Sequence, residues 1–348
     1  MRVVVDENIP YLQTPLRRVA EVTALPAEAI TAEAVREADA LIVRTRTRCD
    51  ASLLAGSHVR FIATATIGYD HIDTVWCDAH GIRWVNAPGC NASSVCQYVE
   101  CALRLLADEG VITLSGSTMG IVGLGHVGSR VKIMAERLGL RTLCCDPPLA
   151  EERSKGQQTN KSTSRLVDRI QRVDLSACCF VDLQTLAAES DILTFHVPLT
   201  KDGPYPTWHM ADAAFFASLR RNPLFINTSR GPVAETAALC AAFQSGQIRQ
   251  AVIDVWEGEP DINLDLLCLA RITTPHIAGY SADGKARASQ MVLDAFAEFY
   301  GLSPLSAETP PPAATPYDID ADSRRLKASP STFEYQRNHY PLRREDLR

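Results

Sequence analysis

The chain has 348 residues, of which 46% are apolar and 22% are charged, a composition typical of a globular protein with about two domains. The formal net charge of −6 argues against a general nucleic-acid-binding surface, which is usually basic. No apolar run reaches the ~18 residues of a membrane helix, and the amino terminus lacks the features of a signal peptide. We therefore expect a cytoplasmic protein with no nucleic-acid or membrane partner.

The first part of the chain, residues 1–110, alternates short apolar strands with helical stretches. The predicted strands cover residues 3–5, 40–43, 61–65 and 84–86. From Ser93 to Ala107 the apolar residues recur at helical spacing, so a long helix should lead out of this unit. Continuous apolar strands separated by helices predict a parallel sheet that is covered on both faces.

A second α/β unit begins at Met119. Its predicted strands cover residues 119–122, 142–145, 192–195, 224–227, 251–254 and 272–274. Six such strands with helices between them are typical of a doubly wound sheet. The sequence thus predicts an α/β protein with two doubly wound parallel-sheet, Rossmann-like domains and a short C-terminal tail.

Two segments interrupt this pattern. Residues 151–176 are polar and predict a surface insertion, while residues 303–316 hold five prolines and predict a stiff, extended linker. The tail beyond it, residues 317–348, is too short to bury a core of its own. We expect it to pack on another surface, with a second subunit as one candidate.

The segment Gly123-Leu124-Gly125-His126-Val127-Gly128 follows a strand and opens a helix. In a dinucleotide-binding turn, the first glycine permits the tight turn, the second lets the backbone approach the pyrophosphate, and the third lets the helix pack closely. Asp146 ends the next strand, where a carboxylate accepts hydrogen bonds from ribose hydroxyls and repels a 2′-phosphate. These features predict NAD as cofactor, the alternative being a glycine-rich turn that binds nothing.

Three later segments place reactive side chains after strands: 227–231, 254–260 and 274–279. Ligands of open parallel sheets bind outside the carboxyl ends of the strands, so these segments should meet in one crevice. His276 suits the role of general base, Arg230 suits a substrate carboxylate, and Glu259 suits the orientation of the imidazole. Taken singly, each has an ordinary alternative: a surface charge for Arg230, an element end for Glu259, and a helix cap for His276.

These segments, in this order and spacing, resemble the D-isomer-specific 2-hydroxyacid dehydrogenase family over about residues 1–300. The resemblance implies that Arg230, Glu259 and His276 are catalytic. It also implies three parts. They are a substrate-binding domain of residues 1–95 completed by 275–300, an NAD-binding Rossmann domain of residues 96–274, and a linker with a shortened C-terminal dimerisation segment, 301–348.

A finer resemblance points to the branch of this family that acts on 4-phospho-D-erythronate in pyridoxal 5′-phosphate (vitamin B6) biosynthesis. Six stretches carry it: residues 5–10, 43–47, 64–71, 87–92, 201–205 and 276–281. The branch implies substrate contacts from Thr45, Thr66 and Tyr280. It implies NAD contacts from Asp146, Thr228, Ser229, Asp254 and Gly279, beside those of Gly123, Gly125, His126, Val127 and Gly128.

A phosphorylated hydroxy acid needs positive charge at both ends. Arg44, Arg46 and Arg48 alternate after a predicted strand and could share one face. We favour Arg44 as a substrate-binding residue, since a solvated edge is an equal alternative for the other two. The 151–176 insertion lengthens the loop on the adenosine side. Residues 333–345 resemble the last stretch of the family's dimerisation domain, so we expect a homodimer with an undefined interface.

The predicted reaction is NAD-dependent oxidation of 4-phospho-D-erythronate to 2-oxo-3-hydroxy-4-phosphobutanoate. Two alternatives stay open: another D-2-hydroxyacid dehydrogenase, acting on 3-phosphoglycerate or glycerate, and a non-catalytic NAD-sensing protein. The eleven cysteines lack the spacing of metal ligands, so we expect buried, reduced thiols and no metal site.

Overall fold

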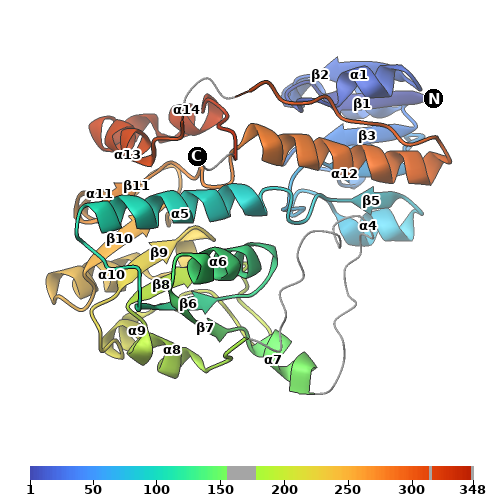
Figure 1. Cartoon of the computed structure of the whole chain (residues 1–348). Coiled ribbons are helices and arrows are strands. Elements are labelled where there is room, and N and C mark those ends of the chain that lie inside the picture. Colours follow the sequence, from blue (N-terminus) through green and yellow to red (C-terminus); the bar gives the residue numbers. More distant parts are fainter. Residues whose placement is uncertain (155–177, 313–315, 346–348) are drawn as a thin grey trace. The chain divides into compact units, whose positions relative to one another are not determined.

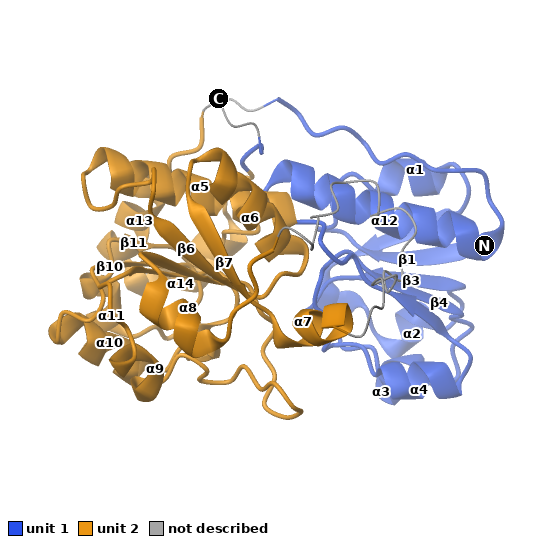
Figure 2. Cartoon of the chain, turned by 60° about the horizontal axis from the view of Figure 1, so that its bottom comes forward, with its two compact units in different colours: residues 1–91, 281–315, 343–346 blue, residues 92–280, 316–342, 347–348 orange. Residues whose placement is uncertain are grey.

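The computed structural model of the protein describes residues 1–154, 178–312 and 316–345. It divides into two compact units, drawn in different colours in Figure 2. Unit 1 comprises residues 1–91, 281–315 and 343–346, and unit 2 comprises residues 92–280, 316–342 and 347–348. Each unit is built on its own parallel sheet (Figure 1). The predicted insertion at 151–176 falls almost wholly outside the described residues.

Unit 1 has a five-stranded sheet in the order β2-β1-β3-β4-β5, with every neighbouring pair parallel. The strands are β1 Arg2–Asp6, β2 Glu21–Leu25, β3 Ala40–Val43, β4 Phe61–Thr64 and β5 Arg83–Val85. Four of them confirm the predicted strands. The edge strand β2 was missed because its side chains are half-buried or exposed, so it lacks a continuous apolar run.

Helices cover both faces of the unit 1 sheet. They are α1 Gln13–Arg17, α2 Ala32–Val35, α3 Ala51–Leu54, α4 Thr74–Ala79, α12 Ala282–Tyr300 and the 3₁₀ turn η1 Ala27–Ala29. On one face, Val292 and Phe296 of α12 pack against Val5 and Phe61 of the strands. On the other face, the apolar side chains of α2, α3 and α4 cover Leu41 and its neighbours. Burial on both faces explains why β3 and β4 are apolar throughout.

Unit 2 has a six-stranded parallel sheet in the order β11-β10-β9-β8-β6-β7. The strands are β6 Thr118–Val122, β7 Arg141–Cys145, β8 Ile192–Phe195, β9 Leu224–Asn227, β10 Gln250–Ile253 and β11 Ile272–Thr273. All six were predicted, with ends that differ by about one residue, which is ordinary for such assignments. The strand order reverses between β6 and β8, so the predicted doubly wound topology is confirmed.

The helices of unit 2 also lie on both faces of its sheet. They are α5 Ala92–Asp108, α6 His126–Arg137, α7 Pro147–Ser154, α8 Leu183–Glu189, α9 Ala213–Ala217, α10 Thr236–Gln244, α11 Leu264–Leu269, α13 Ile319–Ala328, α14 Phe333–Asn338, and the 3₁₀ turns η4 Gly231–Val233 and η5 Pro330–Thr332. The predicted exit helix is confirmed as α5, whose buried Tyr98 and Leu103 pack with α6 against β6. Helices α8 to α11 supply the second core layer.

The C-terminal tail does not form a unit of its own. Residues 301–315 cluster with unit 1, and residues 316–342 cluster with unit 2. Helix α13 lies along the edge strand β11, where Ser323 Oγ accepts a bond of 3.0 Å from the Thr273 N–H. Leu326 and Phe333 are buried in the unit 2 core. The tail therefore packs on its own chain, an outcome that its length alone did not specify.

Most of the eleven cysteines are buried or half-buried in this structure. Burial raises the pKa of Cys49, Cys90 and Cys144 to about 12. Within the described ranges, each helix is too short or too polar to cross a lipid bilayer.

Candidate active site

Unit 2 gathers its predicted functional residues at one edge of the sheet. Because its strands are parallel, their carboxyl ends lie along the same edge. The loops that leave this edge hold the glycine turn after β6, Asp146 after β7, Thr228, Ser229 and Arg230 after β9, Asp254 and Glu259 after β10, and His276, Gly279 and Tyr280 after β11. Open α/β sheets bind ligands at this edge, where the strand order reverses.

The glycine turn has the geometry of a dinucleotide cradle. Gly123 has a φ of +88°, and a Cβ there would lie 2.6 Å from the carbonyl oxygen of His196. A Cβ on Gly128 would lie 1.9 Å from the Gly123 oxygen, so α6 packs directly on the turn. A Cβ on Gly125, by contrast, would meet no atom of the described residues within 4 Å. The first and third glycines thus serve the fold, and the second leaves space beside the amino terminus of α6 that suits a pyrophosphate.

Asp146 ties the end of β7 to this turn. Its Oδ2 accepts a hydrogen bond of 2.7 Å from the Leu124 N–H, and its Oδ1 accepts one of 3.1 Å from the Leu149 N–H. A carboxylate has about four acceptor positions, so acceptor capacity is left for two ribose hydroxyls. The residues present therefore fit NAD, with the helix terminus at the phosphates and Asp146 at the ribose.

The glycines give a matched pair of variants. Gly125→Ala should weaken NAD binding by roughly 10-fold or more with little change in melting temperature, because its Cβ fills the space by the helix terminus. Gly128→Ala should instead destabilise the fold by at least 2 kcal/mol, roughly, since its Cβ overlaps a backbone oxygen. Calorimetric titration with NAD and thermal melts measure the two effects. Equal NAD affinity in Gly125→Ala and wild type would contradict this assignment.

His276 and Glu259 form a hydrogen-bonded pair. The His276 Nδ1 lies 2.9 Å from Glu259 Oε2, while Glu259 Oε1 accepts a bond of 2.9 Å from the Trp256 N–H. Burial raises the pKa of Glu259, but the hydrogen bond and charge of His276, the Trp256 N–H and the charge of Arg337 outweigh it and hold the pKa below its ordinary value. Glu259 is thus a carboxylate at neutral pH, able to orient the imidazole and to stabilise its protonated form.

The backbone of His276 is held in a left-handed conformation, with a φ of +57°. Asp254 holds it there. The Asp254 carbonyl accepts a bond from the His276 N–H at 2.8 Å, and its carboxylate accepts bonds from the N–H groups of Ile277 and Ala278 at 2.8 and 3.0 Å. Burial raises the pKa of Asp254, with the charge of His276 and these bonds opposing it. The predicted NAD contact of Asp254 stays a prediction, beside this structural role.

Arg230 lies on the loop after β9, next to the loop after β10. Gly231 follows it, and a Cβ on Gly231 would lie 2.0 Å from the Trp256 carbonyl atoms, so the β9 and β10 loops touch here. Asn227 donates from Nδ2 to the Arg230 carbonyl at 3.0 Å. The Arg230 side chain is exposed and donates from Nη1 to the Ser229 carbonyl at 2.7 Å, which leaves the other guanidinium N–H groups for a substrate.

The predicted substrate residues of unit 1 lie at the carboxyl ends of its own strands. Arg44 follows β3, and its Nε donates to Oδ2 of the fully buried Asp6 at 2.9 Å. Thr45 is exposed beside it. Thr66 follows β4, and its hydroxyl donates to the Gly68 carbonyl at 2.9 Å. The switch between β1 and β3 is the usual ligand position in a sheet of this order.

Arg44 and Arg48, which alternate with Arg46 after β3, have different surroundings in the structure. Arg48 is exposed and pairs with Asp50 at 2.7 Å, so the solvated-edge alternative describes it better. Lys285 on α12, which the sequence analysis did not select, lies near Arg44. Burial lowers the pKa of Lys285, and the charge of Arg44 lowers it further. Two neighbouring cations in a partly buried position favour an anionic ligand.

Sequence reasoning also missed two residues of unit 2. Burial lowers the pKa of His196 to about 3, so this imidazole is neutral, and its Nδ1 lies 3.3 Å from the hydroxyl of Thr228. Arg337 in the tail lies near Glu259. Spacing along the chain gave no signal for either, because tertiary packing alone brings them to the site.

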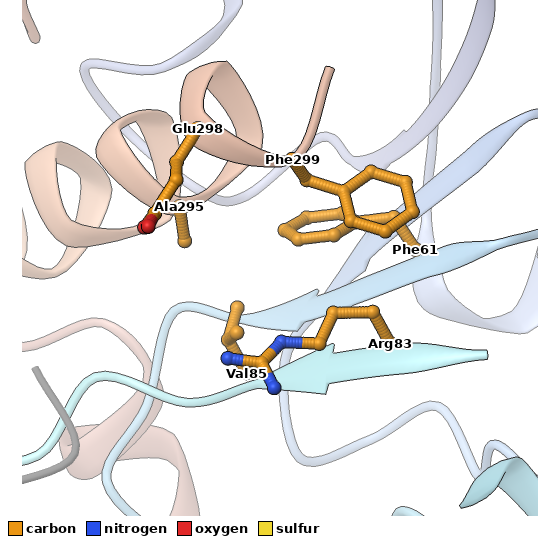
Figure 3. A pocket seen from close by; sticks show the side chains of 6 residues that line it. All are labelled: Phe61, Arg83, Val85, Ala295, Glu298 and Phe299. Carbon is orange, nitrogen blue, oxygen red and sulfur yellow. The ribbon is translucent and has the colours of Figure 1, made fainter. Parts of the chain in front are cut away.

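A pocket on unit 1 lies apart from these strand ends (Figure 3). Its lining residues are Phe61, Arg83, Val85, Ala295, Glu298 and Phe299. Phe61 and Arg83 are the first residues of β4 and β5. The pocket lies along β5, from Arg83 to Val85, and under α12; the proposed substrate residues Arg44 and Thr66 do not line it, and we do not assign substrate to it.

Comparisons with known proteins agree with this arrangement. Residues 106–278 match the family model described as the D-isomer specific 2-hydroxyacid dehydrogenase, NAD binding domain, which confirms NAD as the predicted cofactor. The chain is 47% identical to the erythronate-4-phosphate dehydrogenase of Bacteroides fragilis, covering 99% of this chain and 97% of that protein. It is 42% identical to that of Porphyromonas gingivalis, covering 99% and 94%.

Solved structures confirm the two predicted Rossmann-like sheets. The 2-hydroxyacid dehydrogenase of Ketogulonicigenium vulgare superposes with a TM-score of 0.68 at 21% identity, covering 88% of this chain and 98% of that one. The full-length relatives and the matched NAD-binding domain together make this chain an NAD-dependent oxidoreductase. The chain belongs to the D-isomer-specific 2-hydroxyacid dehydrogenase family, and its relatives at 42–47% identity within it are named erythronate-4-phosphate dehydrogenases.

Proposed function

We propose that this protein oxidises the C2 hydroxyl of 4-phospho-D-erythronate with NAD and yields 2-oxo-3-hydroxy-4-phosphobutanoate. The observation that carries the reaction type is the hydrogen-bonded His276–Glu259 pair at the strand ends, with Arg230 on the adjoining loop. The printed name of the relatives supports the choice of substrate. By the same name, we propose that the step belongs to pyridoxal 5′-phosphate biosynthesis.

Each reacting group has one task in this proposal. His276 Nε2 accepts the proton of the C2 hydroxyl, because Nδ1 is engaged by Glu259. Arg230 binds the substrate carboxylate through its planar guanidinium and polarises the forming carbonyl. NAD, when bound, supplies the acceptor for the C2 hydride. Glu259 stabilises the imidazolium that results.

The phosphate end of the substrate needs a separate cationic site. We propose Arg44, with Lys285 beside it, for this role. The buried carboxylate of Asp6 fixes the Arg44 guanidinium through Nε. That bond leaves the Nη groups for phosphate oxygens. Thr45, Thr66 and Tyr280 are proposed to contact the substrate hydroxyls.

A comparison of substrates tests the proposal. Wild-type protein should oxidise 4-phospho-D-erythronate, with NAD and a 2-oxo acid as final acceptor, far faster than D-glycerate or 3-phospho-D-glycerate. Arg44→Gln should raise KM for the phosphorylated substrate by roughly 10- to 100-fold, because a charged hydrogen bond is lost, while D-erythronate itself changes little. Faster turnover of glycerate or phosphoglycerate would favour a sibling dehydrogenase, and NAD binding without any turnover would favour a sensing protein.

Two further features stay proposals. A homodimer is supported by the resemblance of residues 333–345 to the end of the family's dimerisation domain. A cytoplasmic location is supported by the kind of reaction and by bacterial relatives. Analytical ultracentrifugation of the full chain measures whether it forms a dimer.

A further inference from the structure

The C-terminal tail brings an arginine to the catalytic pair. Arg337 lies on α14, whose first residue, Phe333, is 1% exposed in the unit 2 core. The Nη1 of Arg337 lies 3.5 Å from Glu259 Oε2. This is the same oxygen that lies 2.9 Å from His276 Nδ1. One carboxylate oxygen is thus shared by the imidazole and a guanidinium from the tail.

Arg337 also contacts a proposed substrate residue. Its Nε donates to the hydroxyl of Tyr280 at 3.4 Å. The ring of Tyr280 lies 6.3 Å from the ring of Tyr340, whose hydroxyl donates to Asp322 Oδ2 at 2.7 Å. The tail therefore contacts both loops that carry the reacting groups, the loop after β10 and the loop after β11.

We propose that Arg337 is a positioning residue of the active site, which orients Glu259 and Tyr280 and whose fixed charge sets the pH at which His276 becomes an effective base. This inference deepens the proposed function and rests on it. It assigns the tail a part in the reaction, in addition to packing.

The sign of the effect follows from the charges around the imidazole. Arg337 is a positive charge beside the Glu259 oxygen that His276 contacts, and a like charge disfavours a positively charged ring nearby. Tyr280 lies on the other side of the same guanidinium, where its hydroxyl accepts from Arg337 Nε at 3.4 Å. Burial lowers the pKa of Arg337, but Tyr280, Glu259 and Asp254 raise it above its usual range, so the guanidinium stays charged. Without Arg337, protonation of His276 is easier and the base form requires a higher pH.

The tail is anchored without this contact, which makes the inference testable. Lys327 Nζ donates to the Ala270 carbonyl at 2.6 Å, and Arg271 pairs with Asp320 at 2.8 Å. The Oγ of Ser323 accepts from the Thr273 N–H at 3.0 Å. These bonds and the buried Phe333 should hold α13 and α14 in place when Arg337 is replaced.

The experiment compares pH profiles of log kcat/KM for wild type, Arg337→Met, Arg337→Lys and the matched control Arg324→Met. Arg324 is exposed and pairs only at 3.2 Å with Asp320 among the ion pairs of the described residues. We expect the acid-side midpoint of oxidation to rise by roughly half a unit to one unit in Arg337→Met, as for loss of a nearby, partly exposed charge. Arg337→Lys and Arg324→Met should keep the wild-type midpoint, and the substrate phosphate titrates identically in all four.

A midpoint that is unchanged in Arg337→Met, with only a lower plateau or lower stability, would overturn the inference and leave Arg337 as a packing residue. If Arg337→Met does not fold, Arg337→Gln removes the same charge with a polar side chain and is read in the same way. A different result would contradict the proposed function: wild-type protein that does not turn over 4-phospho-D-erythronate. In that case the profiles are taken with whichever 2-hydroxy acid the wild type oxidises.

Discussion

Arg230→Gln should lower kcat/KM for the hydroxy acid by roughly 10³-fold, since it removes a charged, two-pronged donor from the carbonyl that forms in the transition state. The dissociation constant for NAD should stay close to that of wild type. The glycine turn and Asp146, which form the proposed cradle, lie after other strands. Steady-state kinetics and calorimetric titration with NAD measure the two quantities.

The matched control for this variant is Arg221→Gln. Arg221 is an exposed arginine of the same unit, which pairs with Asp191 at 3.4 Å and precedes β9 instead of following it. We expect its activity to be that of wild type. If Arg230→Gln kept more than about a tenth of the activity, a catalytic role of this order would be excluded.

His276→Asn should cost roughly 10²- to 10⁴-fold in kcat and abolish the acid-side fall of the oxidation profile, because the general base is lost. Asparagine is chosen because it tolerates the left-handed backbone at this position better than most residues. Glu259→Gln should keep the fall but move its midpoint to lower pH, since the carboxylate no longer stabilises the imidazolium. This shift is opposite in sign to that expected for Arg337→Met.

Because the expected midpoint shifts of Glu259→Gln and Arg337→Met have opposite signs, the two pH profiles test the roles of these residues separately. A Glu259→Gln profile that superposes on wild type would remove Glu259 from the role of orienting His276. A fall that persists in His276→Asn would mean that another group titrates in the reaction. NAD binding to each variant checks that the fold is retained.

The sheets could be predicted from the sequence because both are buried on two faces. Strands such as β3 and β9 then appear as continuous apolar runs. The edge strand β2 gave no such run and was missed. The loops after β9, β10 and β11 were found because parallel strands bring their carboxyl ends to one edge, so that neighbours in the sheet become neighbours in the site.

Contacts that depend on side-chain packing were not predictable in this way. The hydrogen bonds by which Asp254 holds the loop of His276 need a backbone conformation that no spacing reveals. Arg337 lies 78 residues after Glu259, and Lys285 lies on a helix far from Arg44 in the chain. The path of the tail along β11 brings Arg337 to Glu259. The packing of α12 on its sheet brings Lys285 to Arg44.

The most direct test of the account is the transfer of the C2 hydrogen. Protein mixed with 4-phospho-D-erythronate that carries deuterium at C2 should give, within one turnover, NADH that holds one deuterium in the nicotinamide ring. Mass spectrometry of the nucleotide after denaturation detects it even when the cofactor stays bound. The account predicts one deuterium per oxo acid formed by wild type, and almost no deuterated NADH from Arg230→Gln in the same time because little oxo acid forms. An oxo acid formed without deuterium in the nicotinamide would contradict direct hydride transfer and, with it, the roles given to His276, Glu259 and Arg230.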